Sequence, residues 1–253
     1  MKDKCKSIII EAGRRLREIK NIKIEEKTDF RNLVTQYDRQ TQDYLVSEFK
    51  KITPDAGFLC EEDDVCNICR EGMYIIDPID GTANFTKGYN LSAISVAYVA
   101  YDEILWGIVY NPFTDELWEA EKGKGAFLNG EPIHVADGGL QNNIIAFGTS
   151  PYDQAKKKRT LNIVDKVMEV SMDVRRLGSA ALDLCYAACG RCGLYFELHL
   201  SPWDCAAGII ICHEAGGIVT DFDGHPVDLS KKTSIIAGSP LCRKEFANII
   251  EEI

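Results

Sequence analysis

The sequence predicts a protein that combines helices and strands in two differently built halves. Residues 4–20 and 37–52 carry apolar side chains at helical spacing, which is typical of amphipathic helices that cover a sheet. Residues 92–120 instead form short apolar runs separated by turns, and this pattern indicates antiparallel strands. From residue 144 to residue 220 strand-like and helix-like segments alternate, which indicates layered α/β structure. The fold class is therefore α+β in the first half and α/β in the second.

Length and composition favour one domain. With 253 residues the chain can bury a large core, and no linker, repeat or low-complexity tract divides it. We therefore expect a single domain over residues 1–253. Its N-terminal half, residues 1–140, should place helices on a mostly antiparallel sheet, and its C-terminal half, residues 141–253, should hold the α/β layers.

The first amphipathic pattern indicates how the N-terminal helix packs. Its apolar stripe consists of Ile8, Ile9, Ala12, Leu16 and Ile19. Basic residues occupy the opposite face, but Glu11 and Glu18 interrupt them. Such a mixed face is typical of a solvated helix and does not indicate a nucleic-acid surface.

The segment that organises the chain is residues 74–85. Residues 73–76 predict a buried strand, which should end near Asp77 because Pro78 cannot donate a ladder hydrogen bond. Asp77 and Asp80 would then lie together at the carboxyl end of a strand, where open α/β sheets bind ligands. Carboxylate oxygens are ligands that Mg²⁺ prefers, so this segment predicts a metal site.

The residues after Asp80 suit an anion. If a helix turn begins there, the backbone N–H groups of Gly81 and Thr82 would face a phosphate. The simpler alternative is that Asp80 only caps that helix. Two further acidic sites favour the metal interpretation, because the glutamates at 61–62 follow an apolar run and Asp204 opens a helix of small residues.

The C-terminal half alternates regularly. Strands are predicted at 144–147, 173–177, 194–197 and 218–220, and helices at 153–170, 179–188 and 203–214. Alternation of this kind places helices against the faces of a sheet.

Two long motifs resemble one known family. Residues 77–85 read DPIDGTANF, and residues 203–208 read WDCAAG and are followed by EAGG at 214–217. Both are similar to the signatures of the inositol monophosphatase family, which belongs to the Mg²⁺-dependent, lithium-sensitive phosphatases together with fructose-1,6-bisphosphatases and bisphosphate nucleotidases. The similarity extends from about Val34 to the C-terminus. It implies a five-layer αβαβα sandwich with a metal site between the two halves.

The resemblance implies a set of metal ligands. Glu62 and Asp77 would bind a first Mg²⁺ together with the Ile79 carbonyl, and Asp77, Asp80 and Asp204 would bind a second. Two or three ions are expected in each active site, and Mn²⁺ is an expected substitute. Paired divalent ions can neutralise a phosphate ester and hold both the attacking and the leaving oxygen.

The same resemblance implies catalytic and auxiliary roles. Glu62, Asp80 and Thr82 would be the catalytic residues, with the Thr82 hydroxyl holding the water that attacks phosphorus directly. The Gly81 and Thr82 amides would bind phosphate oxygens. Lys27 and Asp38 are expected behind the cluster, as auxiliary residues or near a third metal ion.

The substrate pocket is also assigned by resemblance. Glu197 matches the glutamate that binds ring hydroxyls in inositol phosphatases, while Ser179 and Ala180 match a segment that lines the pocket. Asp204 would contact substrate as well. The alternative for Glu197 is a solvent-facing residue at a strand end. No base chemistry is expected of His199.

Charge and hydropathy exclude several kinds of partner. A net charge of −10 argues against a nucleic-acid backbone as the main partner. No apolar run approaches the ~20 residues that span a bilayer, and the N-terminus does not resemble a signal peptide. We therefore expect a cytoplasmic protein without a membrane partner. The resemblance implies a homodimer.

The ten cysteines are expected to be reduced. One group comprises Cys60, Cys66 and Cys69, and a second comprises Cys185, Cys189 and Cys192. Neither has the paired spacing of a zinc site, so reduced thiols in core or loop positions are favoured over zinc or redox chemistry.

The leading hypothesis is a phosphatase that acts on inositol monophosphate or a related sugar or polyol phosphate. A fructose-1,6-bisphosphatase, a 3′(2′),5′-bisphosphate nucleotidase and a histidinol phosphatase are the alternatives within the enzyme class. The basic residues at 156–159 could bind a second phosphate, or could simply form a solvated face. A regulatory protein that binds RNA or transcription partners is the alternative outside it.

Overall fold

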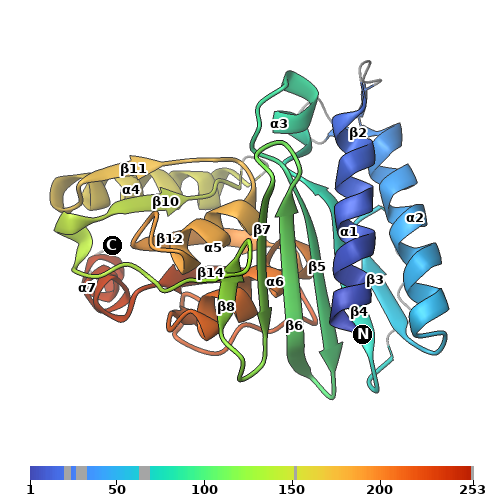
Figure 1. Cartoon of the computed structure of the whole chain (residues 1–253). Coiled ribbons are helices and arrows are strands. Elements are labelled where there is room, and N and C mark those ends of the chain that lie inside the picture. Colours follow the sequence, from blue (N-terminus) through green and yellow to red (C-terminus); the bar gives the residue numbers. More distant parts are fainter. Residues whose placement is uncertain (20–23, 27–32, 63–68, 151–152, 252–253) are drawn as a thin grey trace.

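The computed structural model describes residues 1–19, 24–26, 33–62, 69–150, 153–251. It has five layers, in which helices and sheets alternate (Figure 1). This is the αβαβα sandwich that the sequence predicted.

The first layer consists of two amphipathic helices, α1 (Lys2–Arg17) and α2 (Gln36–Ile52). Figure 1 shows them side by side against one face of the larger sheet. Ile9 and Leu16 of α1 and Phe49 of α2 are buried against that sheet, which confirms the predicted apolar stripes. Helix α1 is tied to the sheet by Lys2, whose Nζ donates to the Glu119 carboxylate at 3.0 Å.

The second layer is a seven-stranded sheet with the order β3-β4-β5-β6-β7-β8-β9. All neighbours are antiparallel except β3 and β4, which are parallel. The strands are β3 (Gly57–Cys60), β4 (Met73–Asp80), β5 (Ala93–Ala100), β6 (Glu103–Asn111), β7 (Glu116–Glu121), β8 (Ala126–Leu128) and β9 (Glu131–Pro132).

Strand β4 runs further than its sequence predicted. It was expected to stop near Asp77, but it continues through Pro78 to Asp80. Its pairing with β5 shifts register between Asp77 and Asp80. A local irregularity of this kind accommodates a proline because no ladder hydrogen bond is required of it there.

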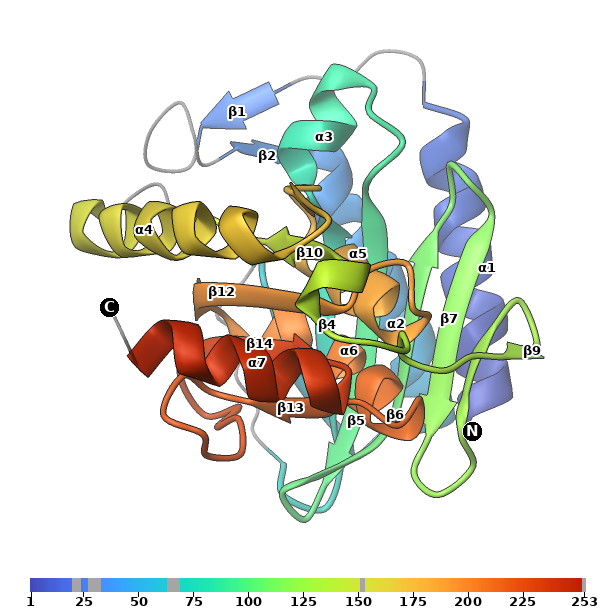
Figure 2. The same cartoon turned by 90° about the vertical axis from the view of Figure 1, so that its left-hand side faces the viewer.

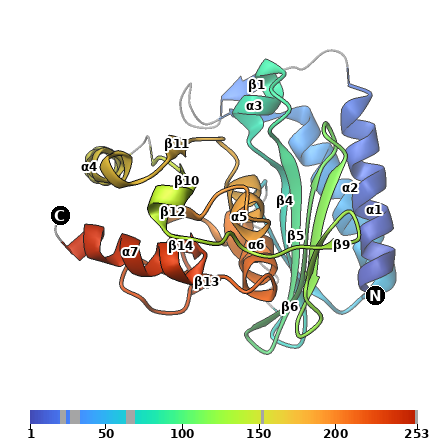
Figure 3. The ribbon, with the colours of Figure 1, turned by 60° about the vertical axis from the view of Figure 1, so that its left-hand side comes forward.

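The third layer consists of α5 (Ala180–Ala188) and α6 (Pro202–Glu214), which lie between the two sheets (Figure 3). Their small and branched side chains form one buried cluster with Ile75, Val109 and Trp118 of the large sheet. Both helices are buried on nearly all sides, as expected for a layer covered on two faces.

The fourth layer is a five-stranded sheet with the order β11-β10-β12-β14-β13. Strands β11, β10 and β12 are parallel, whereas β14 pairs antiparallel with β12 and β13. The strands are β10 (Ile144–Phe147), β11 (Asp173–Arg175), β12 (Leu194–Leu200), β13 (Ile218–Thr220) and β14 (Thr233–Gly238).

The fifth layer consists of α4 (Gln154–Val170) and α7 (Pro240–Glu251), which cover the outer face of the smaller sheet (Figure 2). The remaining elements are β1 (Ile24–Glu26), β2 (Leu33–Thr35), α3 (Thr82–Lys87) and η1 (Leu140–Asn142). No helix among the described residues has the length and apolar character needed to cross a bilayer.

Candidate functional site

Three aspartates form the centre of the candidate site. Asp77 and Asp80 lie at the carboxyl end of β4 and are 2% and 8% exposed, respectively. Asp204 lies in the first turn of α6, where its Oδ2 accepts a hydrogen bond from the Ser201 amide at 2.6 Å. Burial raises the pKa of Asp204, and repulsion from Asp80 raises it further. The structure thus brings together residues from two layers that are far apart in sequence.

Asp80 connects the two halves of the chain. Its Oδ2 accepts hydrogen bonds from the Ser179 hydroxyl at 2.5 Å and from the Ala181 amide at 2.7 Å. Ser179 is also the N-cap of α5 and accepts from the Leu182 amide. The N-cap of α3 is Gly81, so the alternative in which Asp80 merely caps that helix is wrong.

The electrostatics of the cluster favour a bound cation. Burial raises the pKa of Asp77 well above its usual range, and repulsion from Glu61, Asp80 and Asp204 raises it further. Burial also raises the pKa of Asp80 to about 6, although its bonds from Ser179 and Ala181 oppose the shift. Carboxylates that repel one another in a desolvated site are relieved by a hard divalent ion, so this donor set fits Mg²⁺.

Glu61, rather than Glu62, faces these aspartates. The parallel register of β3 and β4 pairs Cys60 with Ile76, and the Glu61 amide extends it by donating to the Ile76 carbonyl at 3.3 Å. Glu61 is therefore level with Asp77, and its charge raises the pKa of Asp77, Asp80 and Asp204.

The expectation for Glu62 therefore needs correction. Its amide donates to the Gln42 Oε1 at 3.0 Å, and the chain bends at residues 61 and 62, just past the end of β3.

Thr82 and Asp38 meet beside the cluster. Thr82 Oγ1 lies 3.2 Å from Asp38 Oδ1 and 3.2 Å from the Ile79 carbonyl oxygen, both acceptors. Asp38 is fully buried, and its other oxygen accepts from the Thr35 amide at 2.7 Å in a capping box. Burial raises the pKa of Asp38. The prediction that Asp38 is buried at this site is confirmed, whereas Lys27 lies outside the described residues.

Gly81 shapes the turn between β4 and α3. Its φ is +85°, a conformation that L side chains rarely adopt. A Cβ at this position would lie 2.9 Å from the Leu91 carbonyl oxygen and 3.2 Å from the Gly178 carbonyl oxygen. Glycine is therefore required where the backbone approaches the C-terminal half.

Glu197 is buried at the other side of the site. It is 8% exposed, so the alternative of a solvent-facing strand end is wrong. Tyr195 donates its hydroxyl to Glu197 Oε2 at 2.7 Å, and a Cβ at Gly148 would lie 1.7 Å from that same oxygen. Burial raises the pKa of Glu197 to about 8, against the lowering effects of Tyr195 and of the Arg176 charge.

The positions of His199, Ala180 and the described cysteines are explained by local packing and hydrogen bonding. His199 Nδ1 lies 3.0 Å from Lys156 Nζ, and burial and the Lys156 charge lower its pKa. Ala180 is buried in the central cluster. Cys69, Cys185, Cys189 and Cys192 are free thiols in the described part of the chain, Cys60 is buried at the end of β3, and Cys66 lies outside the described residues.

A second group of potential metal ligands lies between β13 and β14. Single ligand atoms of Asp221, Asp223 and His225 lie within 4.8 Å of one another. Asp221 Oδ1 already accepts from the amides of Asp223 and His225. These bonds explain the cluster as a turn, and the group is separate from the aspartates of β4 and α6.

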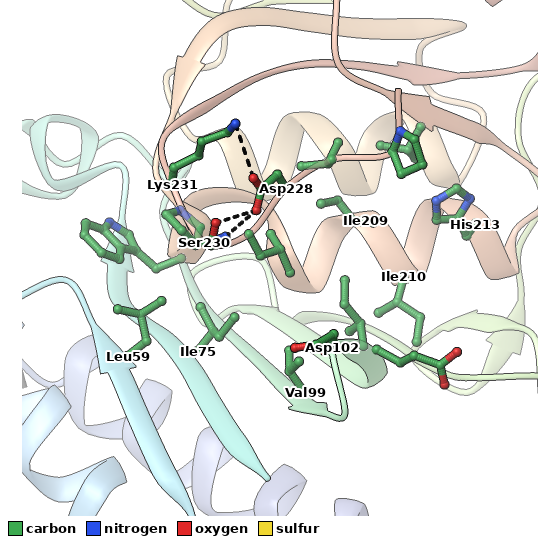
Figure 4. Close-up of a pocket in the computed structure, with 18 of the residues that line it drawn as sticks. Leu59, Ile75, Val99, Asp102, Ile209, Ile210, His213, Asp228, Ser230 and Lys231 are labelled. Atoms are coloured by element: carbon green, nitrogen blue, oxygen red, sulfur yellow. Dashed lines mark hydrogen bonds and ion pairs between the residues drawn. The ribbon is translucent and has the colours of Figure 1, made fainter. Parts of the chain in front are cut away.

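A cavity of about 1130 Å³ is also separate from the aspartates. Figure 4 shows Leu59, Ile75 and Val99 of the large sheet facing Ile209 and Ile210 of α6 across it. The three aspartates do not line it, but Trp203 does. It is an apolar groove beside the site and provides no cluster of acidic ligands.

Comparison with known proteins places this arrangement in a family. Residues 3–253 match the sequence model of the inositol monophosphatase family. The chain belongs to the inositol monophosphatase family. The family is one of phosphatases that are generally metal-dependent, which agrees with the donor set of the site.

Relatives in this family carry more than one name. A Thermotoga maritima protein named fructose-1,6-bisphosphatase/inositol-1-monophosphatase is 37% identical over 91% of this chain and 87% of its own length. A Vibrio cholerae protein named Nus factor SuhB is 39% identical over 87% of this chain and 83% of its own. The crystal structure of the Bartonella henselae extragenic suppressor protein suhB is similar with a TM-score of 0.92 and 34% identity, covering 98% of this chain and 97% of that one.

Proposed function

We propose that this family member is a Mg²⁺-dependent phosphatase that hydrolyses a phosphate monoester of inositol or a related polyol. The observation that carries the proposal is the convergence of Glu61, Asp77, Asp80 and Asp204 in one desolvated cluster. Such a cluster is costly without cations and well suited to two or more of them.

The metal ligands proposed are these four carboxylates and the Ile79 carbonyl, with Glu61 in place of Glu62. Asp77 lies between Glu61, just past the end of the adjacent strand β3, and Asp80 on its own strand, so the three carboxylates could hold divalent ions together. Divalent ions bound here would neutralise the phosphate and make a water molecule more acidic. Mn²⁺ offers a similar preference for oxygen ligands and is the proposed substitute.

The residues of α3 would bind and orient the reacting groups. The Gly81 and Thr82 amides lie at the start of this short helix, where backbone N–H groups are free to hold phosphate oxygens. The Thr82 hydroxyl, which donates its proton to Asp38, would accept a hydrogen bond from the attacking water. Direct attack by water needs no phosphoenzyme, so no cysteine is required as a nucleophile.

Glu197 is proposed to select a polyol. Its carboxylate is held by Tyr195 and lies against Gly148, so its position is fixed before substrate binds. A buried carboxyl group with a raised pKa can both donate to and accept from substrate hydroxyl groups. Ser179 was expected to line the pocket. Because its hydroxyl donates to Asp80, we propose that it positions the Asp80 carboxylate.

The remaining expectations form part of the same proposal. We propose a homodimer of single-domain subunits that acts in the cytoplasm on a small phosphate monoester. The acidic charge of −10 argues against a nucleic-acid partner, and the Nus factor name belongs to relatives of this chain.

A substrate panel tests the proposal. Phosphate release should be measured with inositol 1-phosphate and other monoesters at saturating Mg²⁺, and with EDTA in place of Mg²⁺ as the control. We expect turnover that requires Mg²⁺ and prefers polyol phosphates. Hydrolysis that persists unchanged in EDTA would contradict the metal assignment.

A further inference from the structure

We propose that this protein has a second binding site, which takes a fatty acid, that is, one apolar chain that ends in a carboxylate. The site is the apolar groove of about 1130 Å³ beside the three aspartates (Figure 4). It is independent of the proposed phosphatase function, because none of the four carboxylates proposed to bind metal lines it. Two observations carry the proposal. They are the arrangement of the apolar walls and the charge of one lysine at the rim.

Three separate parts of the fold form the walls of the groove. Ile75 on the inner face of the large sheet and Ile210 of α6 face each other across it (Figure 4). The segment 226–232 between β13 and β14 forms the third wall, where Val227 and Leu229 pack against the central apolar cluster. Apolar side chains on three sides can surround a chain and remove it from water.

The dimensions of the groove suit one long, thin molecule. Pockets for small molecules typically measure about 300–1000 Å³, and this groove lies just above that range. Its lining follows α6 from Ser201, which precedes the helix, to Glu214 at its last residue. Thirteen helical residues extend over roughly 20 Å, so an extended acyl chain fits along the helix.

The charged side chains beside the C-terminal end of α6 already have partners. Asp102 pairs with Arg70 at 2.9 Å, and Glu103 pairs with Lys122 at 2.6 Å. Glu214 accepts from two glycine amides of the turn between β7 and β8. Its remaining negative charge would repel a carboxylate, so the apolar end of the ligand belongs at this end of the groove.

Lys232 lies at the opposite end of the groove. The antiparallel register of β12 and β14 pairs Leu200 with Thr233, which places Lys232 beside Ser201 at the start of α6. Lys232 and Ser201 both line the groove. A carboxylate at this end can therefore accept from a lysine and a serine while its chain follows the helix.

The surroundings of Lys232 favour an anion. The adjacent Lys231 lines the same groove and pairs with Asp228 at 3.3 Å (Figure 4), whereas Lys232 has no acidic partner among the described residues. Burial lowers the pKa of His199, and the charges of Lys156 and Lys232 lower it further. Lys232 thus lies among groups that disfavour additional positive charge, and a bound carboxylate would relieve that repulsion.

Trp203 makes the site observable. It lines the groove and is partly exposed, whereas Trp106 and Trp118 are only 3% and 0% exposed. An occupant of the groove should therefore change the fluorescence of Trp203.

Fluorescence titration and calorimetry test the site with octanoate, decanoate and the neutral 1-octanol. Decanoate should bind about 10-fold more tightly than octanoate, because two further CH₂ groups are buried. Octanoate should bind about 3- to 10-fold more tightly than 1-octanol, the range of a charge-assisted contact. This preference is diagnostic, because the net charge of −10 disfavours anions at an unspecific apolar surface.

Three variants locate the ligand. Lys232→Met should remove the preference for octanoate over 1-octanol, and the fold should tolerate it because Lys232 is exposed. Lys231→Met is the matched control and should keep the preference. Trp203→Phe should remove most of the fluorescence change while calorimetry still detects binding.

Four outcomes would overturn the site. They are no binding of decanoate, equal affinity for octanoate and 1-octanol, an equal loss of preference in Lys231→Met and Lys232→Met, and binding that requires Mg²⁺. The last would place the carboxylate on metal ions at the aspartates, so the titrations are run both with Mg²⁺ and with EDTA. Failure of the phosphatase assay would leave all four measurements interpretable.

Discussion

The Thr82 hydroxyl lies 3.2 Å from a carboxylate oxygen of Asp38, a residue 44 positions earlier in the chain. Thr82 is the first residue of α3, and Asp38 lies in the first turn of α2. Asp38 is held in turn by Thr35, so the orientation of the Thr82 hydroxyl is set by a buried network. Such a network can position a water molecule more rigidly than an exposed threonine could.

Replacement of Thr82 should therefore separate catalysis from stability. Thr82→Ala is expected to lower kcat by about 10²-fold or more with little change in KM, the scale of a lost positioning contact. Thr82→Ser should restore most of the activity because it keeps the hydroxyl. Steady-state kinetics and melting temperature should be measured on both variants. Because Gly81 is the N-cap of α3, loss of a cap would not explain the result, and full activity in Thr82→Ala would refute the role.

The two adjacent glutamates provide a matched pair. Glu61→Gln should reduce turnover by at least about 10²-fold and raise the Mg²⁺ concentration needed for half-maximal activity, because a metal-ligating carboxylate is lost. Glu62→Gln should leave both quantities within about 2-fold of the unmodified protein, since the variant keeps the Glu62 amide that donates to Gln42 and Glu61 remains the carboxylate level with Asp77. The reverse pattern in Mg²⁺ titrations would restore the original assignment to Glu62.

Without metal, stability should fall as pH rises. The folded pKa of Asp80 is raised from 3.8 to about 6, so the folded state binds more protons than the unfolded state between these values. This stabilising contribution is complete below about pH 4 and is lost as pH rises through about 6. Thermal unfolding in EDTA at pH 4.5 and 7.5 measures the effect. Saturating Mg²⁺ should remove it by binding the ionised form.

Asp80→Asn provides the control for that experiment. The variant should lose turnover while keeping its fold, and its metal-free form should lose less stability between the two pH values than the unmodified protein does. An amide oxygen can still accept from Ser179 and the Ala181 amide, so the link between the halves is retained. Near-normal hydrolysis by Asp80→Asn at saturating Mg²⁺ would exclude Asp80 as a ligand.

Lithium offers an independent check on the metal site. Family resemblance predicts that Li⁺ inhibits and that excess Mg²⁺ inhibits as well. Initial rates across a matrix of the two ions measure both effects, with K⁺ as the control for ionic strength. Rates that respond to neither ion would separate this chain from the lithium-sensitive phosphatases.

The sequence predicted the aspartates but not the relations among the elements that hold them. Asp77, Asp80 and Asp204 could be found because each follows a distinctive local pattern. The Ser179 hydrogen bond to Asp80 joins residues 99 positions apart, and no local pattern reveals such a pairing. The choice between Glu61 and Glu62 depends on the register of the parallel strands β3 and β4. An error of one residue in that register exchanges the two glutamates.

The fold was predicted least well where local signals were weak or overridden. The sequence reasoning assigned neither β14 nor α7, because a short apolar run followed by serine and proline does not distinguish a strand from a loop. Strand β4 extends beyond its predicted end because, at the register shift beside Pro78, the sheet does not require a backbone N–H donor from that residue.

The late position of the central helices in the sequence leaves the inner face of the large sheet uncovered for part of synthesis. The large sheet is complete at residue 132, but α5 and α6, which cover its inner face, occupy 180–188 and 202–214. At about 5–20 residues per second, roughly 4–16 s pass before the ribosome has added the last of them. During this time Ile75, Val109 and Trp118 lack their covering layer. We expect nascent chains stalled near residue 150 to bind chaperones and chains stalled after full synthesis to release them, which ribosome pull-down at the two lengths would measure.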